Sequence, residues 1–249
     1  MNDLLLIAAA GTLGGAMNAV AGGGSVVTLP ALVAAGVPSL NANATSTVAL
    51  VPSALASAFA YRHDFAGFEG VKLSAMAIVS IIGGTIGAVL LLYTSQSVFD
   101  KIFPFLLLFG VLVFAFGRKL GEDLRKRMNV HPNTLPAVQF ALGIYGGYFG
   151  GAVGVMMLAA WSILTAAPIN TMQATRNLLN ASMNATASLL FLLAGLVYWE
   201  QMVVLLIAST TGGYLASLFG RRLNPAHARI AISCLNAGIV VVVFWRRFA

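Results

Sequence analysis

Residues 18–32 read NAVAGGGSVVTLPAL, a strongly apolar stretch that three consecutive glycines and a proline interrupt. A glycine in a helix interior costs about 1 kcal/mol relative to alanine, and a proline costs about 3 kcal/mol. One continuous helix is therefore a poor prediction for this first hydrophobic segment. A helix that is broken at the glycines is a better one.

The composition places the rest of the chain in a membrane. Hydrophobic residues make up 59% of the 249 residues and charged residues 8%, whereas soluble domains carry about 25% charged residues. The mean hydropathy is +0.90. The runs 71–92, 98–116 and 202–219 hold few charges and have the roughly 17–25 residues that cross a hydrocarbon core as a helix. The sequence predicts an all-α integral membrane protein that is surrounded by the lipid bilayer.

The net charge of +7 would suit a nucleic-acid partner, but the basic residues gather in the short segments 117–127, 220–229 and 245–247. This is the pattern of cytoplasmic loops under the positive-inside rule, so no nucleic-acid partner is expected. The single cysteine, Cys234, excludes an internal disulfide and indicates no metal cluster.

The chain repeats itself. Residues 11–23, GTLGGAMNAVAGG, align with residues 143–155, GIYGGYFGGAVGV, so that Gly11, Gly14, Gly15 and Gly22 fall on Gly143, Gly146, Gly147 and Gly154. Further on, IGGTIGA at 82–88 aligns with TGGYLAS at 211–217. We interpret this as a duplication; the alternative is chance matching in a glycine-rich chain. A signal peptide is not expected, because the first three residues lack Lys or Arg and the segment has an internal copy.

The duplication gives two halves, 1–116 and 135–249, joined by the basic linker 117–134. Each half opens with a glycine-broken segment that is followed by three ordinary spans. The eight predicted segments are 4–35, 44–61, 71–92, 98–116, 135–167, 174–195, 202–219 and 228–245.

The positive-inside rule decides how the broken segments run. If each folds back as a hairpin, the loops around 62–72, 117–134, 167–176 and 220–229 share one face and carry eleven of the fourteen Lys and Arg residues. If each crosses once, the division is nine to five, which fits the rule less well. The hairpin solution makes the two halves inverted repeats, an architecture of transporters with a site near the midplane. We expect a multi-pass protein of the bacterial cytoplasmic membrane with the linker in the cytoplasm.

Irregular backbone inside a membrane is tolerated only where it is buried in protein or lines a cavity. Backbone amides and helix N-termini at such a turn can hold an anion. The first hairpin would offer Gly22, Gly23, Gly24 and Ser25, with Asn18 as a weaker candidate. The alternative role for the glycines, above all for Gly11, Gly14 and Gly15, is close helix packing.

A polar island follows each hairpin, NANATSTVALVPSALAS at 41–57 and QATRNLLNASMNATAS at 173–188. Arg176, Asn180 and Asn184 recur every four residues and share one helix face. Arginine suits planar or tetrahedral oxyanions. The alternative is that Arg176 reaches the lipid headgroups at the membrane interface. From the two islands we expect substrate contacts at Thr45, Ser46, Arg176, Asn177 and Asn180.

Other function classes find little support. All seven acidic residues lie outside the predicted spans or at their edges, so the buried carboxylate of a proton relay is missing. Three scattered histidines and one cysteine give no nucleophile with its base and no metal ligand set, so neither an enzyme nor a cofactor is expected. An anion leaves a negative cell interior without ion coupling, since the potential contributes about 2.3 kcal/mol per charge per 100 mV. A passive channel or an assembly subunit stays open as an alternative.

The first copy, GxxGGxxNAVAGGGSVVTLPALVAAGV followed by ANATS, resembles the sulfite exporter family TauE/SafE, also called the toluene sulfonate uptake permease family. The resemblance covers the whole chain and implies transport of sulfite, sulfonates and related organosulfur anions across the bacterial inner membrane, mostly outward. It places Gly22, Gly23, Gly24, Pro30, Thr45 and Ser46 in the family's first motif. The second copy departs from the family pattern, with Gly150, Gly151 and Gly154 followed by ATRNLLN at 174–180.

Together these observations predict an exporter of a small sulfur oxyanion that works by alternating access, with its anion site between the two hairpin tips, as a single chain or a homo-oligomer. The alternatives are an anion channel and a transporter of a small carboxylate without sulfur.

Overall fold

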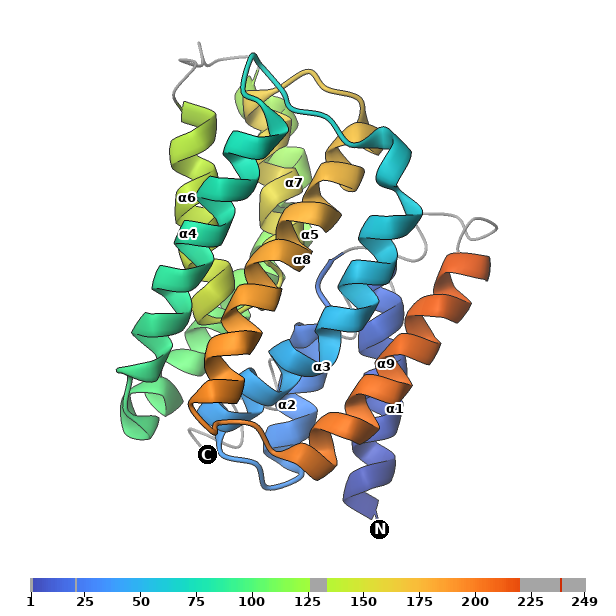
Figure 1. The fold of residues 1–249 in the computed structure, drawn as a ribbon, viewed down its shortest axis with the longest axis vertical. Helices are drawn as coiled ribbons and strands as arrows, with labels where there is room; N and C mark the ends of the chain where they lie inside the picture. The colour runs from blue at the N-terminus through green and yellow to red at the C-terminus, as the bar shows by residue number, and fades with distance from the viewer. Residues whose placement is uncertain (1, 21, 126–133, 220–237, 239–249) are drawn as a thin grey trace.

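The structure is a computed structural model that describes residues 2–20, 22–125, 134–219 and 238. Within them every regular element is helical, and the long helices form one bundle (Figure 1). In chain order the elements are α1 (Asn2–Val20), α2 (Ser25–Ala34), α3 (Ser39–Ala60), the 3-10 turn η1 (Arg62–Asp64), α4 (Leu73–Leu92), α5 (Gln96–Arg125), α6 (Thr134–Tyr148), α7 (Val153–Leu164), α8 (Ile169–Leu193) and α9 (Trp199–Phe219).

Seven of the eight predicted segments coincide with these helices. The glycine-broken segment 4–35 comprises α1 and α2, and the segment 135–167 comprises α6 and α7. The eighth segment, 228–245, lies outside the described residues.

The predicted linker 117–134 is partly helical. Helix α5 continues past residue 116 to Arg125, because Lys, Glu, Leu and Arg are good helix formers whether or not lipid surrounds them. The remainder of the linker, 126–133, lies outside the described residues.

Among the described helices, α4 and the segment Gln96–Val113 of α5 have the length and hydropathy of a membrane span. Helices α3 and α8 are as long, at 22 and 25 residues, but they contain the two polar islands. These two helices pack against each other, and many of their polar side chains are buried. Their polarity therefore belongs to the interior of the bundle.

The first hairpin consists of α1, the turn at residues 22–24 and α2, and it folds back as the glycines predict. Gly22 has φ +76°, a left-handed conformation that glycine adopts without penalty. Its amide donates to the carbonyl oxygens of Met17 and Asn18, both at 3.1 Å, and so closes the end of α1. Gly24 then packs so closely on α1 that a Cβ there would overlap the carbonyl oxygen of Gly14.

The second hairpin consists of α6, the turn at residues 149–152 and α7. Gly150 and Ala152 both have positive φ, +69° and +59°, so the chain reverses within a few residues. Helix α7 folds back on α6, where a Cβ on Gly146 would lie 3.2 Å from a methyl group of Val153. The two halves therefore begin with the same kind of element.

The first helix of each hairpin packs against the opposite half of the chain, α1 along α9 and α6 along α4. Glycine makes these close contacts possible. A Cβ on Gly15 would overlap the carbonyl oxygen of Ser209, and one on Gly147 that of Gly84. The packing role considered for Gly11, Gly14 and Gly15 is thus what the structure shows.

The two hairpins enter the bundle from opposite ends. Gly83 of α4 lies on Gly143 and Gly87 on Tyr148, so α6 runs parallel to α4 and begins at the same end. By the same kind of contact α1 runs parallel to α9, which begins at the other end of the bundle. Figure 1 shows α1 starting at the lower end and α6 at the upper end.

Two of the loops predicted to share one face do lie together. Thr175 donates to the carbonyl oxygen of Ala66 at 2.8 Å, and Thr165 donates to a carboxylate oxygen of Glu69 at 2.9 Å. The loop around 62–72 and the segment before α8 are therefore at the same end of the bundle. In the other two predicted loops, residues 126–133 and 220–229 lie outside the described residues.

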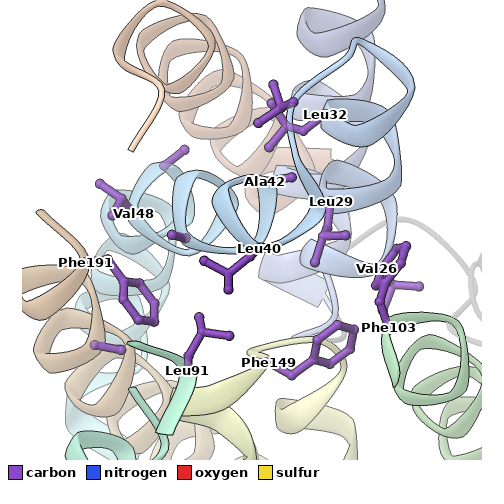
Figure 2. Packing of buried hydrophobic residues seen from close by; sticks show 14 of the residues in the cluster. Val26, Leu29, Leu32, Leu40, Ala42, Val48, Leu91, Phe103, Phe149 and Phe191 are labelled. Atoms are coloured by element: carbon purple, nitrogen blue, oxygen red, sulfur yellow. The ribbon is translucent and has the colours of Figure 1, made fainter. Parts of the chain in front are cut away.

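The hydrophobic core joins α2 and α3 to helices of both halves. Figure 2 shows Val26 and Leu29 of α2 beside Phe103 of α5 and Phe149, the residue after α6. The ring centroids of Phe103 and Phe149 are 6.3 Å apart. The core thus fixes α2, which follows the first glycine turn, in the middle of the bundle.

The outside of the bundle is apolar as well. Large side chains such as Phe59, Ile78, Leu193 and Ile207 are well exposed, Leu193 to 77%. Many large apolar side chains on the outside of a helical bundle are costly in water and suit hydrocarbon.

Candidate functional site

Arg176, in the second turn of α8, is the centre of the candidate site. Its side chain is 1% exposed and is among the largest that are fully buried. The neighbouring Thr175 contacts the loop at Ala66, yet Arg176 points inward. The alternative that Arg176 extends to the lipid headgroups is therefore wrong.

The guanidinium of Arg176 is only partly satisfied. Its Nε and Nη2 both donate to Oδ1 of Asn177, with Nε at 3.1 Å. Nη1 has no acceptor in the described part of the chain, and neither has the Nδ2 of Asn177. Two buried N–H donor groups, one on Arg176 and one on the adjacent residue Asn177, thus have no partner among the described residues, and one of them carries positive charge.

The tips of both hairpins meet at this guanidinium. A Cβ on Gly22 would lie 3.0 Å from Nη1 and 3.1 Å from Cζ of Arg176. A Cβ on Gly154 would lie 3.3 Å from Cδ of Arg176 and 2.9 Å from the carbonyl oxygen of Gly22. Gly22 and Gly154 are the residues that the duplication aligns, so equivalent points of the two halves converge on one arginine.

Ser25 fixes the two tips to each other. Its hydroxyl donates to the carbonyl oxygen of Gly150 at 3.1 Å. Gly23 faces the second tip as well, with a Cβ position 3.9 Å from Cα of Ala152. Gly22, Gly23 and Ser25 therefore lie where the sequence predicts, at the contact between the hairpins.

Two further predicted residues lie beside Arg176 or one turn beyond it. Asn177 orients the guanidinium through its Oδ1. Asn180 accepts a hydrogen bond from Nδ2 of Asn184 at 3.0 Å. The buried face of α8 thus presents arginine and amide groups in a row.

Four other candidates make contacts elsewhere. Gly24 packs on α1 at Gly14. Thr45 accepts a hydrogen bond from the amide of Tyr198 at 3.1 Å, which connects α3 to the start of α9. These contacts position helices.

The remaining pair behaves in the same way. Ser46 and Thr28 join α3 to α2 through their hydroxyl groups, 2.6 Å apart. Asn18 donates to the hydroxyl oxygen of Ser53 at 3.0 Å and joins α1 to α3.

Sequence reasoning named no residue of the second hairpin tip as a site residue. Gly154 contacts Arg176, and its alignment with Gly22 was the signal that could have identified it. A Cβ on Gly150 would lie 3.4 Å from the hydroxyl oxygen of Thr47 and 3.9 Å from Oδ1 of Asn184. These polar groups line the second tip from α3 and α8.

The chemistry of this arrangement favours an anion. A buried charge without a partner is costly, and a buried arginine is stable when acceptors satisfy it. Here the described residues supply one amide oxygen, and an oxyanion would supply acceptors for Nη1 of Arg176 and Nδ2 of Asn177. A metal ion would meet donor groups of the wrong kind, and the described residues contain no group of three His, Cys, Asp or Glu side chains that could hold one.

Comparison with known proteins gives a consistent picture. The family model described as "Sulfite exporter TauE/SafE" matches residues 7–243. The chain is 34% identical over 213 residues to the probable membrane transporter protein YfcA of Escherichia coli K12, which covers 85% of this chain and 77% of that protein. It is 29% identical over 219 residues to a probable membrane transporter protein of Haemophilus influenzae, covering 86% of this chain and 84% of that protein.

A third relative, the probable membrane transporter protein ORF9 of a Sinorhizobium species, is 27% identical over 218 residues, which cover 87% of this chain and 82% of that protein. No solved structure matches the chain.

Proposed function

The chain belongs to the sulfite exporter TauE/SafE family of bacterial membrane transporters, and from this premise we propose that it carries a small sulfur oxyanion, such as sulfite or a sulfonate, outward across the cytoplasmic membrane. The observation that carries the proposal is the buried guanidinium of Arg176 at the contact of the two hairpin tips, with Nη1 unpartnered. An oxyanion would neutralise the charge and accept the unused hydrogen bonds.

The transport cycle rests on two inverted halves. This is supported by the aligned glycines, by hairpins that enter from opposite ends, and by the reciprocal packing of α1 on α9 and α6 on α4. With the anion between the tips, movement of one hairpin opens the site to one side of the membrane, and movement of the other hairpin opens it to the opposite side. This is alternating access around a fixed midplane site.

Two other functions remain alternatives for this site. A carboxylate presents the same planar pair of oxygens to a guanidinium, so a small carboxylate without sulfur is the second candidate substrate. A channel would use the same positive charge to attract anions. Saturation of flux with substrate and a low turnover distinguish the carrier from the channel.

Thermal unfolding of the purified protein in detergent tests the proposal. The ligands are sulfite, thiosulfate, sulfate, short sulfonates and short carboxylates at constant ionic strength, since a ligand that binds only the folded state stabilises it by mass action. We expect selective stabilisation by a sulfur oxyanion that Arg176→Ala abolishes. Arg62→Ala is the matched control, because Arg62 is exposed in the loop after α3 and lies over the ring of Phe59. Equal, small shifts from every salt, or the same response in Arg176→Ala, would refute the proposal.

A further inference from the structure

Among the residues that the structure describes, the interior of the bundle holds a single charge. Arg176 is the only charged residue among the buried side chains that the structure describes, and the other buried polar residues are Asn, Gln, Ser and Thr. Asp3, Asp64, Glu69 and Glu200 are exposed, and Asp100 is half-buried. Neither a second cation nor a carboxylate therefore accompanies Arg176 in this part of the chain.

The count of charges decides which anion the interior tolerates. A singly charged anion on Arg176 gives a neutral pair. A doubly charged anion leaves one negative charge that no described buried group compensates, and an uncompensated charge in a low-dielectric interior is strongly disfavoured.

The available hydrogen-bond donors also favour an anion with one charge. Nε and one N–H of Nη2 of Arg176 donate to Asn177 Oδ1, and the NH2 groups at Nη1 and at Nδ2 of Asn177 have no acceptor among the described residues. Each of these two groups can donate to an oxygen of an anion. Each of the four oxygens of sulfate accepts several hydrogen bonds from water, and the unpartnered N–H groups of Arg176 and Asn177 would replace only part of that solvation.

We propose that the site selects its ligand by charge, accepting anions with one negative charge and rejecting those with two. The inference rests on the proposed function, because it concerns the same anion site. It names the substrate class more narrowly: organic sulfonates and singly protonated sulfite fit the site, whereas sulfate and the fully ionised form of sulfite do not.

Methanesulfonate and sulfate make a matched pair for the test. Both are tetrahedral at sulfur, and they differ by a methyl group in place of one charged oxygen. Their dissociation constants would be measured from the concentration dependence of thermal stabilisation of the full chain in detergent, at constant ionic strength with chloride as the reference salt. We expect methanesulfonate to bind at least about tenfold more tightly than sulfate.

A second dianion separates charge from hydration. Ethane-1,2-disulfonate carries two sulfonate groups, each of which resembles methanesulfonate, and we expect it to bind more weakly than methanesulfonate as well. If sulfate or the disulfonate binds as tightly as methanesulfonate, and Arg176→Ala removes the binding, the charge rule is wrong while the proposed anion site stands. If no anion binds in an Arg176-dependent way, the proposed function fails and the charge rule fails with it.

Discussion

A methyl group at Gly22 is expected to separate the first hairpin from Arg176. In Gly22→Ala the new Cβ would lie 3.0 Å from Nη1 and 3.1 Å from Cζ of Arg176, and 3.2 Å from Cα of Gly154. Because the contact with Gly154 is with backbone, the side chain of Arg176 is the group that must move. The change therefore alters the anion site without removing any donor group.

Gly22→Ala is expected to lower both the stability of the fold and the affinity for the anion. An L-residue at φ +76° costs roughly 1–2 kcal/mol of stability, because its Cβ approaches the backbone. Displacing the guanidinium weakens a charge-assisted hydrogen bond to the anion, which is worth about 1.5–3 kcal/mol. The second effect corresponds to a loss of roughly tenfold to a hundredfold in affinity.

Gly36→Ala is the control that separates the two effects. Gly36 has φ +86°, and a Cβ there would meet nothing within 4 Å. Both variants should therefore unfold at a lower temperature than the parent protein, but only Gly22→Ala should need a higher concentration of methanesulfonate for half-maximal stabilisation. Equal anion affinity in the two variants would refute the argument that the glycine tip shapes the anion site.

Three further changes probe the same account. Asn177→Asp places a carboxylate beside Arg176, so we expect an internal ion pair and a loss of anion-induced stabilisation; an unchanged response would contradict the need for a free positive charge. Thr45→Val removes the hydrogen bond from the amide of Tyr198 and should lower the free energy of unfolding by about 0.5–1.5 kcal/mol, because this part-buried hydrogen bond is lost. Its anion affinity should stay unchanged, and a loss would return Thr45 to the site. Gly147→Ala should destabilise the α4–α6 contact by about 1–3 kcal/mol through overpacking; a thermal unfolding temperature equal to that of the parent would show that the helices separate easily.

The hairpins could be predicted from the sequence because glycine restricts what a chain can do. A run of three glycines inside an apolar segment costs too much as a helix, and Gly22 with its positive φ confirms the turn there. The role of Gly24 could not be predicted in this way. It belongs to the same run, but glycine is needed there because a Cβ would overlap the carbonyl oxygen of Gly14 on α1, and the residues around Gly24 in the sequence do not reveal that contact.

The polar side chains were harder to assign. The periodicity of α8 put Arg176 and Asn180 on one face, but the position of that face in the bundle depends on the packing of α3 and α8. The sequence predicts ligand contacts for Thr45 and Ser46, and in the structure their hydroxyl groups connect helices; their contact with substrate stays a prediction. A hydroxyl in an apolar helix satisfies either purpose, and only its partner, more than 150 residues away for Thr45, distinguishes them.

Transport in proteoliposomes tests the central claim most directly, since that claim joins the buried arginine to movement of an anion. Vesicles that contain the wild-type chain, Arg176→Gln or Arg62→Gln would be loaded with radiolabelled methanesulfonate, and its loss would be followed with a negative potential imposed inside. The account predicts saturable efflux from the wild-type and Arg62→Gln vesicles and only background leakage from Arg176→Gln vesicles with the same amount of folded protein. Equal efflux from Arg176→Gln would contradict it.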